Sequence, residues 1–357
     1  MADLDPPEAH RPTRAPEAPG VRHHTHVDHP SPSPSPGSLD APTLTDVLEA
    51  RRRIAPYLPR TPLRHYPNLS RLVGADVWVK HESFLPTGAF KVRGGINLVS
   101  QLTPAERERG VIAASTGNHG QSIAYAARLF GVAAVICAPA AANPVKVEGM
   151  RDLDAEVVLH GRHFDEAREH CEKLTREHGY RYVHSGDEPL LIAGVGTYTL
   201  EILEDEPRLD VLIVPIGGGS GAAGACVVAK AVNPALQVIG VQSRQAQAAY
   251  QSWRSGELTQ APNETVTEGL STGTAFELPQ SILRRHLDDF VLVDDTSILE
   301  AAALLVEKTR ALTEPAGAST LAAALDVRER LQGKRVGIVA SGGNISPPQL
   351  QEALGRL

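Results

Sequence analysis

Short apolar runs alternate with amphipathic stretches along much of the chain. The run from Val111 to Ala114 predicts a buried strand, and the polar loop 115–120 after it opens a predicted helix that continues through Arg128. The next predicted elements repeat this order, with strands at 133–137 and 156–159 and helices at 145–153 and 165–178. Such alternation predicts mostly parallel, twisted sheets with helices on both faces.

The same rhythm resumes in the second half of the chain. The predicted strands there span 211–214, 238–241, 290–293 and 336–340, and the predicted helices span 197–203, 222–231 and 297–312, with another helix before the last strand. A long stretch from 243 to about 278 is predicted to be irregular. We therefore expect an α/β fold with two domains and a site in the cleft between them. Residues 40–109 and 188–357 are expected to form the larger domain, and 110–187 the smaller one.

The N-terminal segment has a different composition. Residues 1–39 are rich in proline, serine and histidine and contain little to bury, so we predict a disordered tail. The first helix is predicted to begin at Thr43 or Thr45, where a hydroxyl can cap it, and to end before Pro56.

Composition and charge narrow the class of partner. Hydrophobic residues make up 42% and charged residues 22% of the chain, as in soluble globular proteins. A net charge of -7 argues against nucleic acid or an anionic membrane and favours small polar metabolites. The chain has no apolar run of membrane-spanning length and no secretion signal, and its three cysteines have no metal-like spacing. We therefore expect a cytoplasmic protein.

Lys91 is the first candidate for chemistry. It lies between Phe90 and Val92, just after a Pro-Thr-Gly turn. Desolvation disfavours the ammonium form, so a partly buried lysine is well suited to form a Schiff base with an aldehyde. An isolated lysine at the start of a helix is more often a solvated surface residue. The interpretation therefore depends on three other motifs.

The first of these motifs is a glycine loop between an apolar strand and a helix. It consists of Gly217, Gly218, Gly219, Ser220 and Gly221. Its amides and the helix N-terminus would form a nest for a phosphate. Residues 219–224 also fit G-x-G-x-x-G, which leaves a dinucleotide-binding oxidoreductase as an alternative. That alternative expects an acidic residue at the end of the next strand, where this chain has Gln242, so a single phosphate is the better ligand.

The other two motifs follow strands as well. The loop Ser115-Thr116-Gly117-Asn118-His119-Gly120 offers amides suited to a substrate carboxylate, although a purely structural turn has the same pattern. Ser341 ends the last strand at the edge where such sheets bind ligands. A reactive lysine, a phosphate nest, a carboxylate nest and this serine together point to pyridoxal phosphate and an amino acid.

These motifs identify a resemblance that runs from about Thr43 to Ser346. The chain resembles the serine/threonine dehydratase and serine racemase family of pyridoxal-phosphate enzymes, which have the tryptophan-synthase-β type of fold, fold type II. The resemblance implies that Lys91 forms the Schiff base with pyridoxal 5'-phosphate. It also implies the other cofactor contacts: Phe90 beside the ring, Asn118 on the ring hydroxyl, Gly217 through Gly221 on the phosphate, Ser341 on the pyridine nitrogen, and Gly269 and Glu314 bordering the ring.

The resemblance further implies a substrate and a reaction. Ser115, Thr116, Asn118 and His119 would wrap the substrate carboxylate. The implied activity is β-elimination from a β-hydroxy-L-amino acid, by default threonine or serine, to give a 2-oxo acid and ammonia in a homodimeric lyase. Other 3-hydroxy amino acids (3-hydroxyaspartate, a phenylserine or a hydroxyectoine-derived compound), racemisation, and a non-catalytic protein that binds pyridoxal phosphate remain open.

Three positions depart from the family pattern. Thr116 stands where racemases have a serine as the second base, so we expect elimination to be faster than racemisation. Gln242 and Ala248 replace two carboxylates of the racemase cation site, so we expect no metal. Gly186 replaces an asparagine that touches the cofactor in some relatives.

Overall fold

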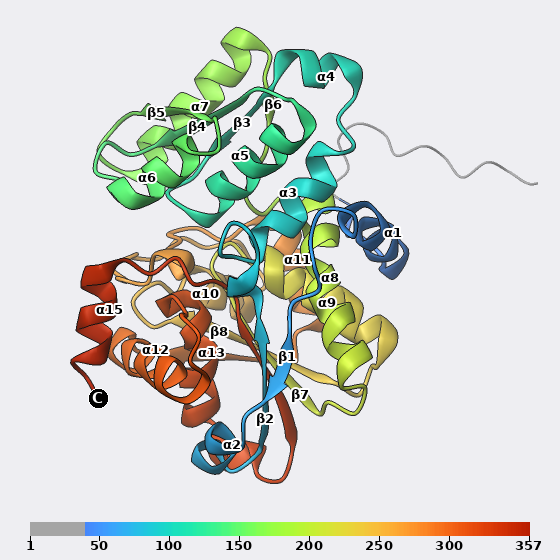
Figure 1. The fold of residues 1–357 in the computed structure, drawn as a ribbon, viewed down its shortest axis with the longest axis vertical. Helices are drawn as coiled ribbons and strands as arrows, with labels where there is room; N and C mark the ends of the chain where they lie inside the picture. The colour runs from blue at the N-terminus through green and yellow to red at the C-terminus, as the bar shows by residue number, and fades with distance from the viewer. Residues whose placement is uncertain (1–39) are drawn as a thin grey trace, which may run out of the picture. The chain divides into compact units, whose positions relative to one another are not determined.

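Two sheets form the framework of the computed structural model, which describes residues 40–357 (Figure 1). The larger sheet has six strands in the order β1-β2-β10-β7-β8-β9, and the smaller has four in the order β5-β4-β3-β6. All neighbouring strands are parallel except β1 and β2. The predicted α/β class is confirmed. The prediction of a disordered tail concerns residues 1–39, which lie outside the described residues.

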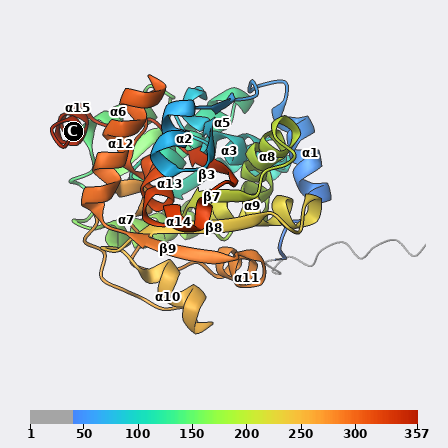
Figure 2. The same cartoon turned by 90° about the horizontal axis from the view of Figure 1, so that it is seen from below.

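The strands of each sheet come from separate parts of the chain. The larger sheet contains β1 (Leu63–His65), β2 (Asp76–His81), β7 (Val211–Pro215), β8 (Gln237–Ser243), β9 (Asp289–Val293) and β10 (Arg335–Ala340). The smaller sheet contains β3 (Val111–Ala114), β4 (Ala134–Ala138), β5 (Glu156–Leu159) and β6 (Arg181–Tyr182). Figure 2 shows β8 and β9 side by side at one end of the larger sheet. The described residues, 40–357, lie within one compact unit, so the division into two domains stays a prediction.

Helices connect the strands. In the first half of the chain they are α1 (Leu44–Ile54), α2 (Pro67–Val73), the 3-10 turn η1 (Glu82–Phe84), α3 (Lys91–Val99), α4 (Pro104–Arg109), α5 (Asn118–Phe130), α6 (Pro144–Arg151) and α7 (Phe164–His178). In the second half they are α8 (Pro189–Asp205), α9 (Ser220–Val232), α10 (Ala248–Ser255), the 3-10 turn η2 (Glu268–Leu270), α11 (Glu277–His286), α12 (Asp295–Thr309), α13 (Pro315–Asp326), α14 (Arg328–Leu331) and α15 (Pro347–Leu354). Among residues 40–357 no helix is long and apolar enough to cross a membrane.

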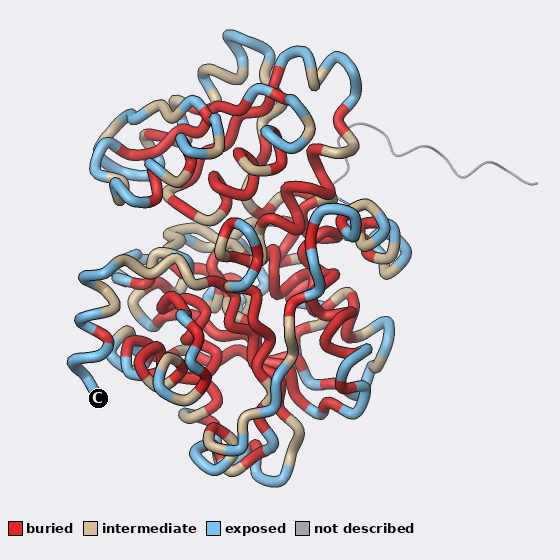
Figure 3. The backbone as a smooth tube through the Cα atoms, in the orientation of Figure 1, coloured by how far each residue is buried: buried red, intermediate tan, exposed pale blue. Residues whose placement is uncertain are grey.

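The strand pleat divides the interior into separate cores. On β7, Leu212 and Val214 belong to a core that contains α8 and α9, whereas Val211 and Ile213 belong to a core that contains α12 and α13. This alternation is what a strand buried on both faces requires. The first core continues through α3 and α5 to one face of the smaller sheet. Figure 3 shows that the inner strands of the larger sheet are largely buried, as in β7, β8 and β10.

Most predicted elements are found within a few residues of their expected ends. The cap at Thr43 is confirmed, since its hydroxyl accepts a hydrogen bond from Asp46 N at 3.4 Å and α1 ends at Ile54. The prediction of an irregular stretch from 243 to 278 is wrong in part, because it contains α10 and η2. Trp253 of α10 packs against the core and donates its indole N–H to Leu283 O at 3.2 Å.

Helix α3 directly after Lys91 was not predicted. It contains Gly94 and Gly95, which lower helix propensity. The structure explains why glycine is present. A Cβ at Gly94 would lie 3.0 Å from the Leu191 carbonyl oxygen, and a Cβ at Gly95 would lie 2.6 Å from the Ser122 carbonyl oxygen. The two glycines therefore let α3 contact α8 and α5 closely.

The crossing of α8 and α9 provides a test of this close packing. A Cβ at Gly224 would lie 2.8 Å from both Gly196 N and the Ile192 carbonyl oxygen. We expect Gly224→Ala to lower the free energy of unfolding by about 1–3 kcal/mol, because backbone atoms must move apart. Urea denaturation measures this change.

Gly149→Ala in α6 is the matched control. There the nearest atom to a new Cβ is the mobile end of Gln121, 3.3 Å away. We expect the stability of this variant to be unchanged or raised by up to about 1 kcal/mol, since alanine favours helix. Equal stability of the two variants would contradict the packing argument.

Candidate active site

Lys91 opens α3 and reaches the glycine loop. Its Nζ donates to Ser220 Oγ at 2.7 Å and to the Ser185 carbonyl oxygen at 3.2 Å. Ser220 is the first residue of α9, and Gly219 before it is the N-cap residue with φ +88°. That left-handed conformation favours glycine. The structure thus brings together two motifs that the sequence separates by 129 residues.

The surroundings of Lys91 make it a weaker base than an ordinary lysine. Burial of its ammonium lowers the pKa of Lys91 to about 8. Both oxygens that accept from Nζ are uncharged, and Nζ lies 5.4 Å from the centre of the Phe90 ring. Roughly half of such lysines are neutral amines at pH 8, which is the form that attacks an aldehyde.

The glycine loop leaves no room for side chains. A Cβ at Gly217 would overlap the Gly269 carbonyl oxygen, one at Gly218 would overlap the Phe276 ring, and one at Gly221 would lie 2.9 Å from the Phe90 ring. The amides in the first turn of α9 have no partner within the helix. A phosphate fits these residues, because helix N-termini and bare backbone bind anions. The loop therefore fits a cofactor phosphate next to Lys91.

A short ladder joins the Lys91 segment to the end of β10. Phe90 N donates to Ser341 O at 2.9 Å, and Gly343 N donates to Gly88 O at 2.8 Å. Ala89 and Gly342 form an antiparallel bridge between them. Ser341 is buried. The ladder fixes Ser341 relative to Phe90, as a shared cofactor site requires.

Asn118 contacts two other residues near the site. Its Nδ2 donates to Glu314 Oε1 at 2.6 Å, and its Oδ1 accepts from Asn344 Nδ2 at 2.8 Å. Burial raises the pKa of the Glu314 carboxyl. Gly269 is close by, since a Cβ there would lie 3.9 Å from Glu314 Oε1. The structure brings Asn118, Gly269 and Glu314 together, while their contacts with a cofactor stay predictions.

The loop 115–120 organises its own polar groups. Ser115 Oγ accepts from Gly117 N at 3.1 Å and from Gly120 N at 2.9 Å. His119 Nε2 lies 3.1 Å from the Val183 carbonyl oxygen, so Nε2 carries the proton and Nδ1 is an acceptor. Nδ1 is buried and has no partner. Burial and the nearby Lys91 lower the pKa of His119 to about 3, so its ring is neutral.

This geometry limits the predicted carboxylate contacts. A neutral imidazole with a free acceptor cannot attract a carboxylate through charge. The Ser115 oxygen accepts two hydrogen bonds from the loop backbone, which leaves its hydroxyl hydrogen as a donor. Backbone amides near the start of α5 are further donors suited to a carboxylate. The substrate roles of Ser115, Thr116, Asn118 and His119 stay predictions.

Lys146 and Phe276 lie at the site and were not predicted from the sequence. Lys146 of α6 forms an ion pair with Glu268 of η2, and its Nζ would lie 3.5 Å from a Cβ at Gly117. Lys146 is buried, and with Glu268, Gly269, Glu314 and Asn344 it lines a small cavity. The sequence does carry a signal, because Lys146 lies between two valines much as Lys91 lies between Phe90 and Val92.

Phe276 explains why this chain has Gly186 where some relatives have an asparagine. A Cβ at Gly186 would overlap the Phe276 ring, which also packs on Gly218 and has its centre 4.7 Å from that of the His184 ring. An asparagine at 186 would need that space. Phe276 therefore covers one side of the glycine loop, a contact between distant residues that no local pattern predicts.

The two positions where racemases of the family have cation-binding carboxylates carry an amide and an apolar side chain in this chain. Gln242 is buried at β8, where its Oε1 accepts from Tyr250 N at 3.1 Å, and Ala248 opens α10. Within residues 40–357 no three His, Cys, Asp or Glu side chains group as metal ligands. The expected absence of a metal stays a prediction.

Comparison with known proteins agrees with this geometry. A family model described as "Pyridoxal-phosphate dependent enzyme" matches residues 54–342. The chain is 38% identical over 304 residues to the L-threonine ammonia-lyase of Thermotoga maritima, covering 85% of this chain and 76% of the relative. It is 36% identical over 305 residues to the L-threo-3-hydroxyaspartate ammonia-lyase of Saccharomyces cerevisiae, covering 85% and 94%. The structure of maize serine racemase superposes with a TM-score of 0.83 and 32% identity, covering 89% of this chain and 98% of that one.

The lowered pKa of Lys91 can be tested by chemical labelling. In cofactor-free protein, the rate of reductive methylation at Lys91 should rise with pH up to about 8 and then level off, because the neutral amine reacts. A free lysine derivative should keep rising to its ordinary pKa of about 10.4. Peptide mass spectrometry measures the labelling. A rate that still climbs above pH 10 at Lys91 would show a solvated amine.

Proposed function

The chain belongs to the pyridoxal-phosphate-dependent enzymes, and we propose that it is an ammonia-lyase for a β-hydroxy-L-amino acid. The products would be a 2-oxo acid and ammonia. L-Threonine and L-serine are the proposed substrates. The observation that carries the proposal is the contact between Lys91 Nζ and Ser220 Oγ beside the glycine loop. The family match replaces the alternative of a dinucleotide-binding oxidoreductase.

The cofactor is pyridoxal 5'-phosphate, and several residues fit it. We propose that the amides of 217–221 hold its phosphate, that Phe90 packs beside its ring, and that Ser341 and Asn118 bond its polar atoms. Bound pyridoxal phosphate supplies an electron sink that makes the Cα proton of a bound amino acid acidic. The ladder between residues 88–90 and 341–343 supports this shared arrangement, because it holds Lys91 and Ser341 at a fixed separation.

Lys91 is the proposed base. A pKa of about 8 leaves part of the lysine neutral near physiological pH, so Nζ can accept the Cα proton. The resulting ammonium would have two acceptors ready, Ser220 Oγ and the Ser185 carbonyl oxygen, at 2.7 and 3.2 Å in this structure. These contacts also orient Nζ before the transfer.

The start of α5 is the proposed carboxylate site. Its helix N-terminus favours an anion, and the neutral His119 ring adds no charge that would hold the product. Ser341 would meet the ring nitrogen with an uncharged hydroxyl. Beside a neutral hydroxyl the ring nitrogen would stay unprotonated, and a neutral ring withdraws electrons less strongly than a protonated one. We propose that this favours loss of the β-hydroxyl over repeated exchange of the Cα proton.

Racemisation is the second candidate, since maize serine racemase is a structural neighbour. It requires another acid on the face opposite Lys91. Thr116 offers a hydroxyl there by resemblance, but its branched Cβ restricts the rotamer. We propose that elimination is the faster reaction.

Assembly and location complete the proposal. We propose a homodimer, as the resemblance to dehydratases implies. We also propose a cytoplasmic location, which the reduced state of Cys137, Cys171 and Cys226 supports, because all three are buried and free.

The decisive assay is a substrate panel with the purified holoenzyme. Ammonia and oxo-acid release should be measured with L-threonine, L-serine, L-threo-3-hydroxyaspartate and a phenylserine. We expect turnover of at least one of the first two, and a loss of roughly 10²–10⁴-fold or more in Lys91→Ala, because the base is removed.

Chiral chromatography of the same samples separates the alternatives. Accumulation of D-amino acid as fast as oxo acid would show a racemase. Faster turnover of L-threo-3-hydroxyaspartate than of threonine and serine would show that the substrate is a dicarboxylic amino acid. Holoenzyme without turnover of any β-hydroxy amino acid would show a protein that only binds the cofactor.

A further inference from the structure

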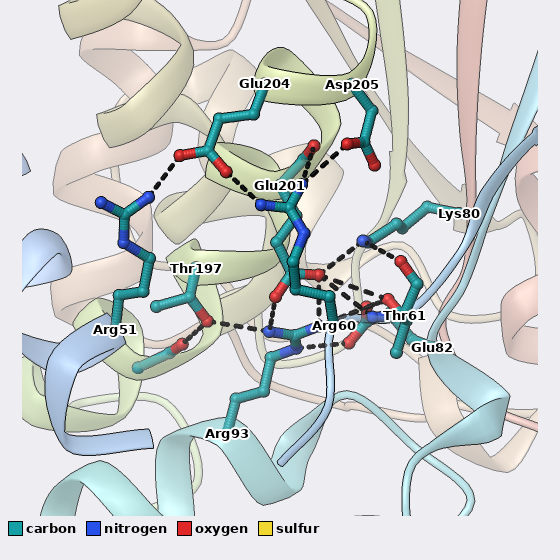
Figure 4. A network of polar contacts seen from close by, with 11 residues as sticks. Arg51, Arg60, Thr61, Lys80, Glu82, Arg93, Thr197, Glu201, Glu204 and Asp205 are labelled. Carbon is teal, nitrogen blue, oxygen red and sulfur yellow. Dashed lines mark hydrogen bonds and ion pairs between the residues drawn. The ribbon is translucent and has the colours of Figure 1, made fainter. Parts of the chain in front are cut away.

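Four buried charged side chains lie together beside α3, the helix that begins at Lys91 (Figure 4). We call Lys80, Glu82, Arg93 and Glu201 the charge cluster. Two are cations and two are anions, so their formal charges cancel. They come from β2, η1, α3 and α8, which the sequence separates by up to 121 residues. The cluster therefore joins the elements that surround the Lys91 segment.

Arg93 is the centre of the charge cluster. Its guanidinium binds both oxygens of Glu82, with Nε to Oε2 at 2.7 Å and Nη2 to Oε1 at 2.9 Å. It also binds both oxygens of Glu201, with Nη1 to Oε1 at 2.7 Å and Nη2 to Oε2 at 2.9 Å. Nη1 further donates to Thr197 Oγ1 at 3.2 Å. Only the planar fork of arginine can serve two carboxylates at once in this way.

Lys80 and Thr61 complete the contacts. Lys80 Nζ donates to Glu201 Oε2 at 2.5 Å and to the Thr61 carbonyl oxygen at 2.7 Å. Thr61 Oγ1 donates to Glu82 Oε1 at 2.6 Å. Burial alone would raise the pKa of Glu201, but Arg93 and Lys80 hold it below its ordinary value. Glu201 is therefore an anion, and both carboxylates of the cluster accept hydrogen bonds at each of their oxygens.

Arg93 and Lys91 lie on opposite sides of the same helix, which links the charge cluster to the candidate site. The two residues are two apart on α3, so their side chains project roughly 200° apart around the helix axis. Lys91 faces the glycine loop, and Arg93 faces the cluster. Glu82 and Arg93 also bracket the segment 82–93, which carries Phe90 and Lys91. Their ion pair closes this segment, while the ladder to 341–343 holds its middle.

Stability alone does not account for such a cluster. Buried ion pairs are often no more stabilising than apolar side chains of the same volume, because desolvation offsets the attraction. What the guanidinium provides is a fixed geometry, with α3, η1 and α8 held at hydrogen-bond distances. A fixed geometry of α3 matters most for Lys91, because its Nζ must be placed accurately beside the glycine loop.

We propose that Arg93 is a positioning residue for Lys91. By clamping Glu82 and Glu201, it fixes the first turn of α3 so that Lys91 Nζ reaches Ser220 and the glycine loop. The inference rests on the proposed function of Lys91. It predicts that a disturbed cluster leaves phosphate binding by the loop largely intact but weakens the covalent attachment of the cofactor to Lys91.

The test compares Arg93→Lys, Glu82→Gln and Arg60→Gln with the parent holoenzyme. Arg93→Lys keeps the positive charge but removes the planar guanidinium that binds two carboxylates. Glu82→Gln keeps the shape of the side chain but removes its negative charge. Arg60 is the matched control, because it pairs with Glu204 and Asp205 at the exposed end of α8, where its side chain is 51% exposed. Its hydrogen bond to Glu201 is made to the main-chain oxygen, at 3.4 Å, and not to the carboxylate that Arg93 binds. Total bound pyridoxal phosphate and the fraction that borohydride fixes to protein are measured separately.

We expect both cluster variants to bind pyridoxal phosphate but to show a lower borohydride-fixed fraction. Their kcat should fall by roughly 10–100-fold, the cost of a misplaced catalytic group, with a much smaller change in KM. Arg60→Gln should match the parent in all three measurements. If Arg93→Lys fails to fold, Glu82→Gln decides the question.

Two results would overturn the inference in distinguishable ways. A parent with no borohydride-fixed cofactor would remove the proposed role of Lys91 and the inference with it. A parent with a normal fixed fraction, and cluster variants that equal it in fixed fraction and kcat while melting at lower temperature, would leave the proposed function standing. The charge cluster would then serve stability only.

Discussion

Desolvation of the Lys91 ammonium group is the constraint on which the rest of the site depends. Burial lowers its pKa to about 8, and its two hydrogen-bond acceptors are uncharged oxygens. A carboxylate beside Nζ would favour the ammonium and cancel this effect. The buried carboxylates Glu82 and Glu201 instead bind Arg93 on the opposite side of α3. The fold thereby separates the Lys91 amine from the charged groups around Arg93, only two residues away.

Backbone groups form the part of the candidate site that suits anions. The loops 217–221 and 341–343 follow the neighbouring parallel strands β7 and β10 of the larger sheet, which direct them to one edge. Loop 115–120 follows β3 of the smaller sheet, and the hydrogen bond between Asn118 and Asn344 brings α5 to the same region. The glycines among them allow contacts that a Cβ would block, such as Gly218 against Phe276 and Gly342 against Glu314. The neutral ring of His119 adds no charge to this region. An anion-binding site made of amides and helix ends suits a phosphate and a carboxylate at neighbouring positions.

Local patterns predicted the parts of this structure that local physics determines. The strands β3, β4, β5 and β7 are runs of apolar residues, and Lys91 and the glycine loop have distinctive neighbours in sequence. The charge cluster was not predictable, because Arg93 and Glu201 are 108 residues apart and nothing near either one specifies the other. The ion pair of Lys146 with Glu268 was missed for the same reason. Helix α3 was missed because its glycines reflect tertiary contacts and oppose its local propensity.

Mapping the attachment site of the cofactor tests the central claim most directly. The holoenzyme is reduced with borohydride and digested, and its peptides are analysed by mass spectrometry. The account predicts one phosphopyridoxyl group per chain, on the peptide that contains Lys91. Lys146 is the informative alternative, because it is also buried, flanked by apolar residues and close to the loop 115–120. A label on Lys146, or a label spread over exposed lysines, would contradict the account.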